Sequence, residues 1–94
     1  MINLAIPKNN LLKPTTMKAR NLTEADERAI LDNITEGYPV KLTQANGITR
    51  TISMKRNNGE EKYTLEVAGM TINSNNPDLA LANLRRYKYT KIEF

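Results

Sequence analysis

The sequence contains no cysteine and no histidine. The chain therefore has no disulfide, no thiol nucleophile, none of the usual zinc ligands and no imidazole, the commonest general base. Its four glycines are scattered rather than clustered in a phosphate-binding loop. No apolar run approaches the ~20 residues that span a membrane, and the N-terminus lacks the apolar stretch of a signal peptide. These absences predict a cytoplasmic protein that is not an enzyme and holds neither cofactor nor metal.

Charge is unevenly distributed along the 94 residues, whose formal net charge is +4. Residues 1–22 carry cations and no acid, residues 23–36 are mainly acidic, and residues 85–94 are basic again. Because opposite charges attract at short range, we expect the acidic stretch to compete with any outside partner for the basic ends. A chain of this length forms one domain with a small core.

The clearest pattern runs from Tyr38 to Val67, where alternating apolar residues are interrupted by Asn46-Gly47 and Asn58-Gly59. Asn-Gly between alternating stretches is the strongest short-range signal for a β-hairpin. The pattern therefore predicts a three-stranded antiparallel meander.

Matching the apolar faces fixes the register, because a one-residue slip would move every side chain to the other face. The second Asn-Gly suits a two-residue type I′ turn, which pairs Met54 with Tyr63. The first Asn-Gly must lie in a three-residue loop, residues 45–47, if Val40 is to pair with Ile52. We therefore expect a G1-bulge hairpin there, with its glycine in the left-handed region.

Two helices are predicted beside the meander. A capping-box-like start at Thr23 opens a helix over residues 24–36, which ends at Gly37. Asn76 and Pro77 are the N-cap and first residue of a second helix. With one sheet face covered by both helices, the fold class is a two-layer α+β domain of order α-β-β-β-α. The residues expected to face the core are Ala29, Ile30, Leu31 and Ile34 in the first helix and Ala80, Leu81, Leu84 and Tyr87 in the second.

Residues 1–22 are predicted to be a basic N-terminal arm in front of a single domain, residues 23–94. In this arm Ile2, Leu4 and Ile6 alternate up to a proline. This leaves two interpretations open, a short edge strand or an arm donated to a partner, as in a dimer. Residues 70–72 are expected to form a brief strand after a bend, and the C-terminal residues to add a last strand or pack on the sheet edge.

Charged side chains supply the candidate partner-binding residues. The face of the meander away from the core is polar, and its residues are Lys41, Thr43, Thr49, Thr51, Ser53, Lys55, Lys62, Thr64 and Glu66. Arg50 falls on the apolar face opposite Leu42, and we expect its stem to be buried and its charged end to reach solvent. The candidates are Lys18, Arg20, Glu24, Glu27, Lys41, Arg50, Lys55, Arg56, Glu60, Glu61, Lys62, Arg85 and Arg86.

Part of the meander resembles that of the small anti-CRISPR proteins that inhibit single-protein CRISPR nucleases. The similar stretches are Tyr38–Leu42, Ile48–Arg50, Ile52, Asn57–Glu60 and Tyr63. The resemblance implies a helix-meander-helix fold and an inhibitor that occupies the surface where the nuclease recognises DNA. Those inhibitors are strongly acidic, whereas this chain is basic. The likeness therefore does not imply DNA mimicry by the whole surface, and the acidic first helix is the segment that fits it.

Two further resemblances concern other families. Residues 62–67 and 79–84 are similar to HicB-type antitoxin domains, which adds a third kind of protein-binding function. The α-β-β-β-α order also resembles double-stranded-RNA-binding domains. That family opens its second helix with a lysine cluster, where this chain has Asn76–Leu79, so the family's phosphate-binding element is missing.

The leading hypothesis is a phage or mobile-element protein that inhibits a host defence or nucleic-acid-handling protein, such as a CRISPR effector, by direct binding. Abundant asparagine, threonine, isoleucine and lysine, typical of AT-rich bacterial genomes and their phages, agree with this origin. The alternative is a DNA- or RNA-binding module that uses the basic arm and the polar sheet face. The polar face has no aromatic residue for base stacking, which favours the inhibitor. The sequence leaves the oligomeric state open.

Overall fold

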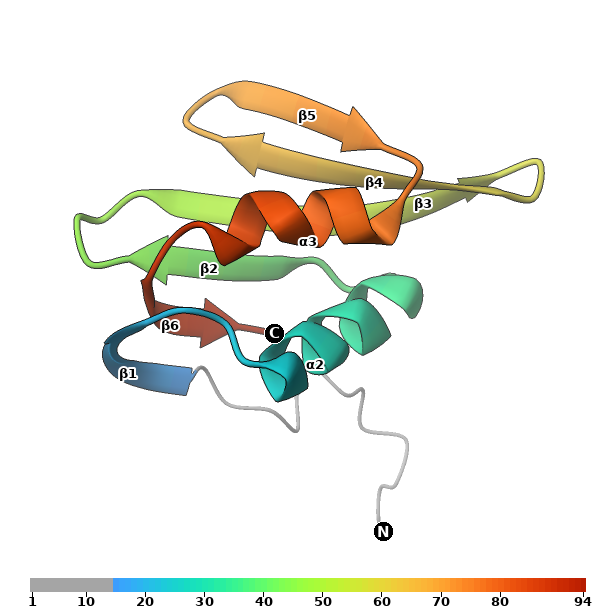
Figure 1. Ribbon diagram of the computed structural model, residues 1–94. Coiled ribbons are helices and arrows are strands. Elements are labelled where there is room, and N and C mark those ends of the chain that lie inside the picture. Colours follow the sequence, from blue (N-terminus) through green and yellow to red (C-terminus); the bar gives the residue numbers. More distant parts are fainter. Residues whose placement is uncertain (1–14) are drawn as a thin grey trace, which may run out of the picture.

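The computed structural model describes residues 15–94, which form two helices and a six-stranded antiparallel sheet (Figure 1). The strand order across the sheet is β1-β6-β2-β3-β4-β5. The elements are β1 (Thr15–Arg20), α2 (Glu24–Thr35), β2 (Val40–Gln44), β3 (Thr49–Asn57), β4 (Glu60–Val67), β5 (Met70–Ser74), α3 (Pro77–Arg85) and β6 (Tyr89–Glu93). The alternating residues Ile2, Leu4 and Ile6 lie outside the described part of the chain.

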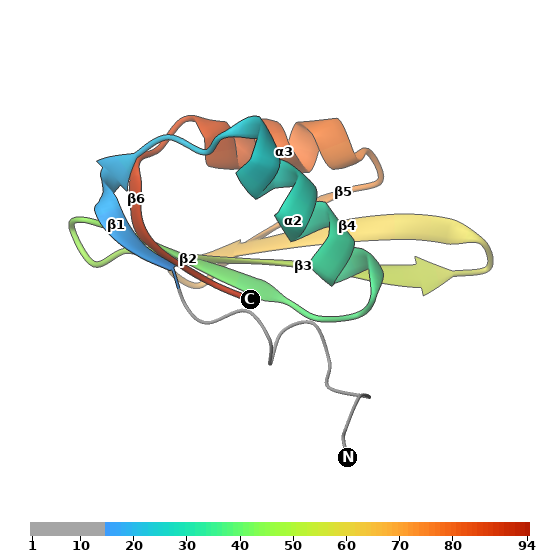
Figure 2. The ribbon, with the colours of Figure 1, turned by 90° about the horizontal axis from the view of Figure 1, so that it is seen from below.

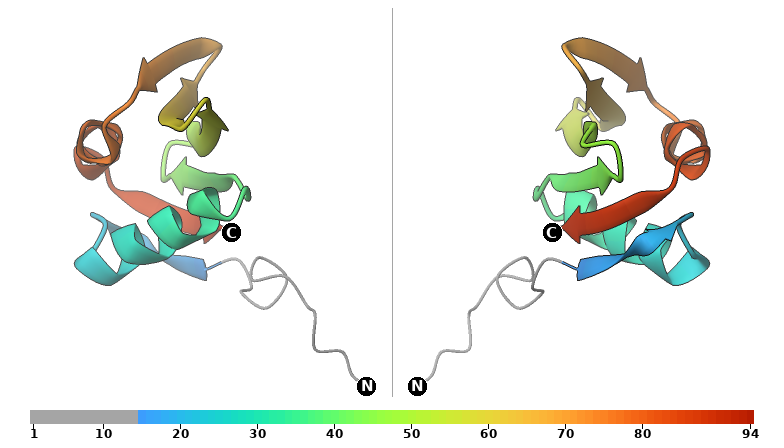
Figure 3. Two further views of the ribbon diagram at one scale, coloured as in Figure 1. Left: turned by 90° about the vertical axis from the view of Figure 1, so that its right-hand side faces the viewer. Right: turned by 90° about the vertical axis from the view of Figure 1, so that its left-hand side faces the viewer.

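Both helices lie on one face of the sheet, and no other element of residues 15–94 covers the opposite face (Figure 2). The sheet curls around the helices (Figure 3), as twisted antiparallel sheets do. The core fills the space between the two layers. Its buried apolar residues are Ile30, Ile34, Val40, Leu42, Ile52, Tyr63, Leu65, Ala80, Leu81, Leu84, Tyr89 and Ile92.

The predicted meander register is confirmed. Val40 pairs with Ile52, and Met54 pairs with Tyr63. The first loop spans residues 45–47, because the Gln44 amide donates to the Ile48 carbonyl at 2.9 Å. Its glycine has φ 90°, in the left-handed region expected of a G1-bulge turn.

The second turn also has the predicted geometry. Asn58 and Gly59 have φ values of 51° and 82°, as both central residues of a type I′ turn require. Glycine at the second of these positions reaches positive φ without steric strain, because it has no side chain. The two similar Asn-Gly signals thus form two different turns.

Helix α2 begins and ends as predicted. The Thr23 hydroxyl accepts a hydrogen bond from the Asp26 amide, and the Asp26 carboxylate accepts one from the Thr23 amide. At the other end Gly37 has φ 95°, and the Tyr38 amide donates to the Asn33 carbonyl at 2.9 Å, as in a Schellman motif. Ile30 and Ile34 are buried and Leu31 is half-buried.

Helix α3 starts at the predicted N-cap, where the Asn76 side chain accepts from the Asp78 amide at 2.8 Å. Pro77 takes the first helical position. Ala80, Leu81 and Leu84 are buried against the sheet, and Tyr87 is half-buried.

The three-stranded α-β-β-β-α fold class is wrong, because the sheet has six strands. β5 is a full strand that turns back antiparallel onto β4 through Ala68 and Gly69, whose φ values are 48° and 83°. After α3 the chain forms β6, which pairs with β2 on the side away from β3, and β1 pairs with β6. Residues 15–20, predicted as part of an arm, therefore form an outer strand.

The brief strand expected over residues 70–72 is confirmed as part of β5, and β6 is the last strand that was one of two alternatives for the C-terminal residues. The places of β1, β5 and β6 in one sheet were not predicted, for physical reasons. The β4–β5 turn uses alanine at a left-handed position, where asparagine or glycine is the usual signal. The register between β2 and β6 shifts after Thr43, so Thr90 is opposite no residue in that ladder and the alternation of β6 is interrupted. Strands β1, β6 and β2 are neighbours in space and distant in sequence, so no local pattern specifies their pairing.

Candidate functional site

The uncovered face of the sheet, called the open face below, is polar across its width. Partners in an antiparallel ladder point to the same side, so the pairing register defines rows of side chains. The rows are Thr16-Lys91-Thr43-Thr49, Glu93-Lys41-Thr51-Glu66-Thr71, Ser53-Thr64-Asn73, Lys55-Lys62 and Asn57-Glu60. Four lysines and three glutamates give these rows a net charge of +1, and none of their residues is apolar.

Lys55 and Lys62 lie directly opposite each other on β3 and β4, and both are exposed. Like charges in facing positions destabilise a sheet. No salt bridge among residues 15–94 includes either lysine. An anion that lies across the two ammonium groups would remove this repulsion.

Arg20 is occupied by a contact within the chain. Its guanidinium bonds the Asp26 carboxylate at 2.5 Å and thereby joins the end of β1 to the start of α2. Partial burial alone would raise the pKa of Asp26, but the hydrogen bonds from Arg20 and Thr23 outweigh it and hold that pKa below its usual range. Arg20 therefore has a role in the fold.

Arg85 and Glu27 tie the two helices together. Arg85 donates from Nε and Nη2 to the two carboxylate oxygens of Glu27, at 2.7 and 2.9 Å. This bidentate pair, mainly through its hydrogen bonds, raises the pKa of Arg85 further above its usual range. Asp78 lies 3.5 Å from the same guanidinium. The expected competition of the acidic helix for basic residues therefore occurs at Arg20 and Arg85.

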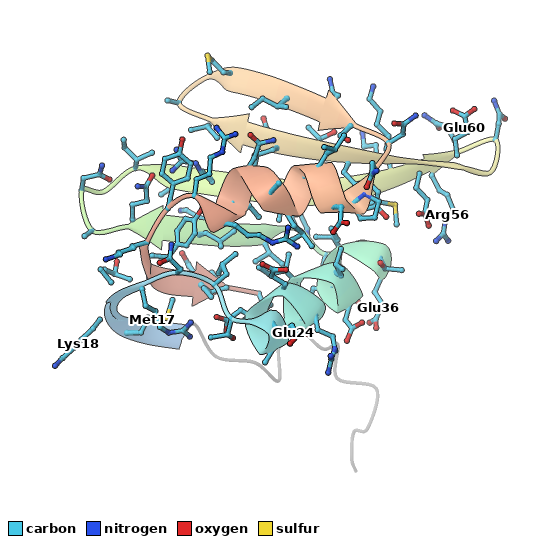
Figure 4. All side chains as sticks on the ribbon, in the orientation of Figure 1. Met17, Lys18, Glu24, Glu36, Arg56 and Glu60 are labelled. Carbon is cyan, nitrogen blue, oxygen red and sulfur yellow. The ribbon has the colours of Figure 1, made fainter. Side chains whose placement is uncertain are left out.

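The tip of the β3–β4 hairpin carries a third pair, Arg56 with Glu61 at 2.8 Å. Figure 4 shows Arg56 and Glu60 at this tip, far from Lys18 on β1. The Tyr63 hydroxyl donates to the same Glu61 carboxylate at 3.0 Å. The hydrogen bond from Arg56, followed by that from Tyr63, holds the pKa of Glu61 below its usual range.

Arg50 lies on the apolar face opposite Leu42, as predicted, but the expectation that it reaches solvent is wrong. The residue is only 7% exposed. The Tyr87 ring covers its guanidinium, with the ring centre 3.7 Å from Cζ. No local pattern indicates this contact, because Tyr87 follows α3 and is far from Arg50 along the chain.

The remaining candidates are exposed and dispersed. Lys18 lies on the outer strand β1, Glu24 at the start of α2, Lys41 on the open face, and Arg86 at the C-cap of α3. Lys91 on β6 joins the open face although the sequence did not single it out. Its partner Thr43 was predicted to be on that face, but only the pairing of β6 with β2 places them together.

Exposed apolar side chains lie on β5, at the opposite edge of the sheet from β1, and on the following helix. Met70 and Ile72 on β5 are 63% and 39% exposed, and Leu79 on α3 is 57% exposed. We call these three residues the β5 patch. They are three of the four large apolar residues exposed in residues 15–94. β5 contains no charge, whereas the other edge strand carries Lys18 and Arg20.

The surface of residues 15–94 also has depressions, among them a groove and a smaller cavity. A groove of about 340 Å³ lies beside the hairpin tip and is lined by Asn57, Glu60, Glu61, Lys62, Asn73, Ser74 and Asn75. A smaller cavity of about 100 Å³ is lined by Arg50, Leu65, Val67, Met70, Ile72, Asn83 and Tyr87. Within residues 15–94 no group of three or more Asp or Glu side chains is placed to hold a metal ion. In the same residues no helix is long and apolar enough to cross a membrane.

No family model matches the chain, and no curated protein or solved structure matches it significantly.

Proposed function

We propose that this chain is a non-enzymatic protein that binds nucleic acid through the open face. The observation that carries the proposal is the placement of Lys41, Lys55, Lys62 and Lys91 on one side of neighbouring strands. Lysine ammonium groups bind phosphate oxygens and release condensed counterions. The serine and threonine hydroxyls between them supply further hydrogen bonds to phosphate.

The expected ligand is a duplex held by its backbone. Binding of single strands relies on bases stacked on aromatic side chains, and the open face has none. Six strands spaced about 4.8 Å apart make the face roughly 24 Å wide, which matches about seven base pairs of duplex. Contacts limited to phosphate carry little sequence preference. The chain would meet this ligand in the cytoplasm of a bacterial host cell.

Mobility shifts test this proposal. Duplex DNA, duplex RNA and single-stranded DNA would be titrated at 50 mM and 200 mM salt. We expect a duplex shift at 50 mM that weakens steeply at 200 mM, because each neutralised phosphate releases counterions. Absence of any shift at 50 mM salt would contradict the proposal.

A second candidate, an inhibitor that binds a nuclease or another nucleic-acid-handling protein, is favoured by the β5 patch. An uncharged edge strand with exposed apolar side chains is open to pairing with a strand of another protein. The acidic face of α2 supports this candidate less than expected, because Asp26 and Glu27 are engaged by arginines of the same chain. Any inhibition of a CRISPR-type nuclease would therefore depend more on β5 than on DNA mimicry.

The inhibitor candidate is tested by the substitution Ile72→Lys, which places a charge on the β5 edge. A nuclease retained from bacterial lysate by the wild type and lost by this variant, with no nucleic-acid shift by either protein, would favour the inhibitor. Lys55→Gln on the open face is the matched control and should leave such a complex intact.

A further inference from the structure

The cavity of about 100 Å³ between β3, β4, β5 and α3 contains a buried cation without an acidic partner. Arg50 lines it and is only 7% exposed. No salt bridge among residues 15–94 includes Arg50, and residues 1–14 contain no Asp or Glu. The charge is therefore not neutralised by a carboxylate side chain of this chain.

The guanidinium is also incompletely hydrogen-bonded. Nη1 of Arg50 is buried and has no hydrogen-bond partner within residues 15–94. The Tyr87 ring, 3.7 Å from Cζ, supplies a cation–π contact that offsets only part of the lost hydration. Burial of a charge without a paired anion is unfavourable, so this arginine weakens the fold at the place where it lies.

The walls of the cavity define what would satisfy the arginine. Leu65, Val67, Met70 and Ile72 are apolar, and Asn83 adds an amide that donates to the Leu79 carbonyl and has a second hydrogen. One guanidinium matches a singly charged carboxylate in a bidentate geometry. The cavity volume equals that of about three water molecules in the liquid. A carboxylate on a short aliphatic body has roughly the same volume.

We propose that this cavity is a binding site for a carboxylate carried on a short aliphatic body, with Arg50 as the anion-binding group. The apolar residues of β4 and β5 hold the aliphatic part, and Tyr87 closes the site over the guanidinium. Two sources have this chemistry: a free short-chain acid, and the C-terminal residue of a peptide that lies along β5. The site is on the helix-covered face, so it goes beyond binding at the open face and does not depend on it.

The test begins with amide NMR spectra of the full chain titrated with sodium butyrate, with butyramide as the uncharged control. We expect butyrate, with a dissociation constant on the order of 1 mM, to shift amides of β4, β5 and α3. Butyramide should bind at least tenfold more weakly. Equal shifts from both compounds, or butyrate shifts elsewhere on the protein, would overturn the proposal.

A second pair of probes distinguishes a free short-chain acid from a peptide C-terminus as the ligand. These probes are acetyl-Gly-Gly-Val with a free carboxylate and the same peptide as its amide. A peptide source predicts that the free-carboxylate peptide binds more tightly than butyrate and also shifts the exposed edge of β5. A free-acid source predicts that butyrate binds at least as tightly as the peptide. Failure of both butyrate and the peptide carboxylate to bind would refute the site.

Arg50→Met separates binding from a purely structural role. This change removes the charge and keeps an apolar stem, so we expect a higher melting midpoint without ligand and at least a tenfold loss of butyrate affinity. A lower midpoint with unchanged butyrate shifts would show that Arg50 acts only in the fold. Met70→Glu, at the exposed rim of the cavity, is the second variant. Its carboxylate should occupy the site and abolish the butyrate response, and a retained response would contradict the assigned location.

Discussion

The facing lysines on β3 and β4 predict that stability and binding change in opposite directions. Lys62→Glu replaces a like-charge pair with an opposite-charge pair across from Lys55. For ammonium groups about 7 Å apart in water the repulsion is about 0.6 kcal/mol, and low salt screens little of it. Removal of this repulsion and formation of an attraction should stabilise the fold by about 1 kcal/mol at 10 mM salt. In a domain of this size that corresponds to a rise of roughly 4–8 °C in melting temperature.

Thermal unfolding followed by circular dichroism at several salt concentrations measures this effect. The gain should fall to about half at 150 mM salt and nearly vanish at 1 M, where the Debye length is about 3 Å. Lys62→Gln, which removes the repulsion without adding an attraction, should give about half of the gain. A lower melting temperature for Lys62→Glu, or a gain that salt does not reduce, would refute the electrostatic reasoning.

The same substitution should weaken duplex binding, because it places a negative charge on the open face. Arg28→Glu makes the same change in net charge on the exposed surface of α2, on the other side of the sheet. This control should bind much more tightly than Lys62→Glu. Equal losses in the two variants would indicate that only net charge matters and that the open face is not the contact surface.

Two further predictions concern titratable groups in the fold. Asp26→Asn removes an ion pair to Arg20 and weakens the cap of α2, so we expect a loss of about 1–2 kcal/mol at neutral pH by urea unfolding. Because the folded-state pKa of Asp26 is lowered, the wild-type advantage should be lost as pH falls below about 4, and an advantage that persists in acid would contradict this origin. Burial, the largest cause, raises the pKa of Tyr89 to about 12. The folded state thus holds the phenol proton more tightly, and stability should fall by roughly 2–3 kcal/mol as pH rises from 10 to 12. Tyr89→Phe loses only the hydrogen bond to the Leu84 carbonyl, so its stability should not fall by this amount between pH 10 and 12. If stability depended on alkaline pH identically in the two proteins, the assignment of this loss to Tyr89 would be wrong.

The features predicted correctly from the sequence are those determined by neighbouring residues. The two hairpin registers follow from matched apolar faces, and the caps at Thr23 and Asn76 follow from hydrogen bonds within a few residues. The outer strands depend instead on pairings between distant segments, such as β6 between β1 and β2. Their own sequences are short, and β6 is interrupted at Thr90, so the sequence suggested strands at residues 70–72 and at the C-terminus without their places in the sheet.

The candidate site was predicted only in part, for a related reason. Lys41, Lys55 and Lys62 follow from the strand alternation, but their neighbour Lys91 required the long-range pairing of β6. Charge alone made Arg20, Glu27 and Arg85 candidates for partner binding, and their ion pairs within the chain could not be predicted from it. The burial of Arg50 under Tyr87 depends on where α3 ends above the sheet, which no local pattern specifies.

The central claim, that the open face binds the phosphate backbone, is tested most directly by the salt dependence of duplex binding. Fluorescence anisotropy would compare the wild type with the triple variant Lys41→Gln, Lys55→Gln and Lys62→Gln between 50 and 200 mM salt. With three or four phosphates neutralised, the wild type should give a slope of about −3 to −4 in log K against log salt, and the variant should lose roughly three units of that slope. Equal slopes for the two proteins, or no binding by the wild type at 50 mM salt, would contradict the account.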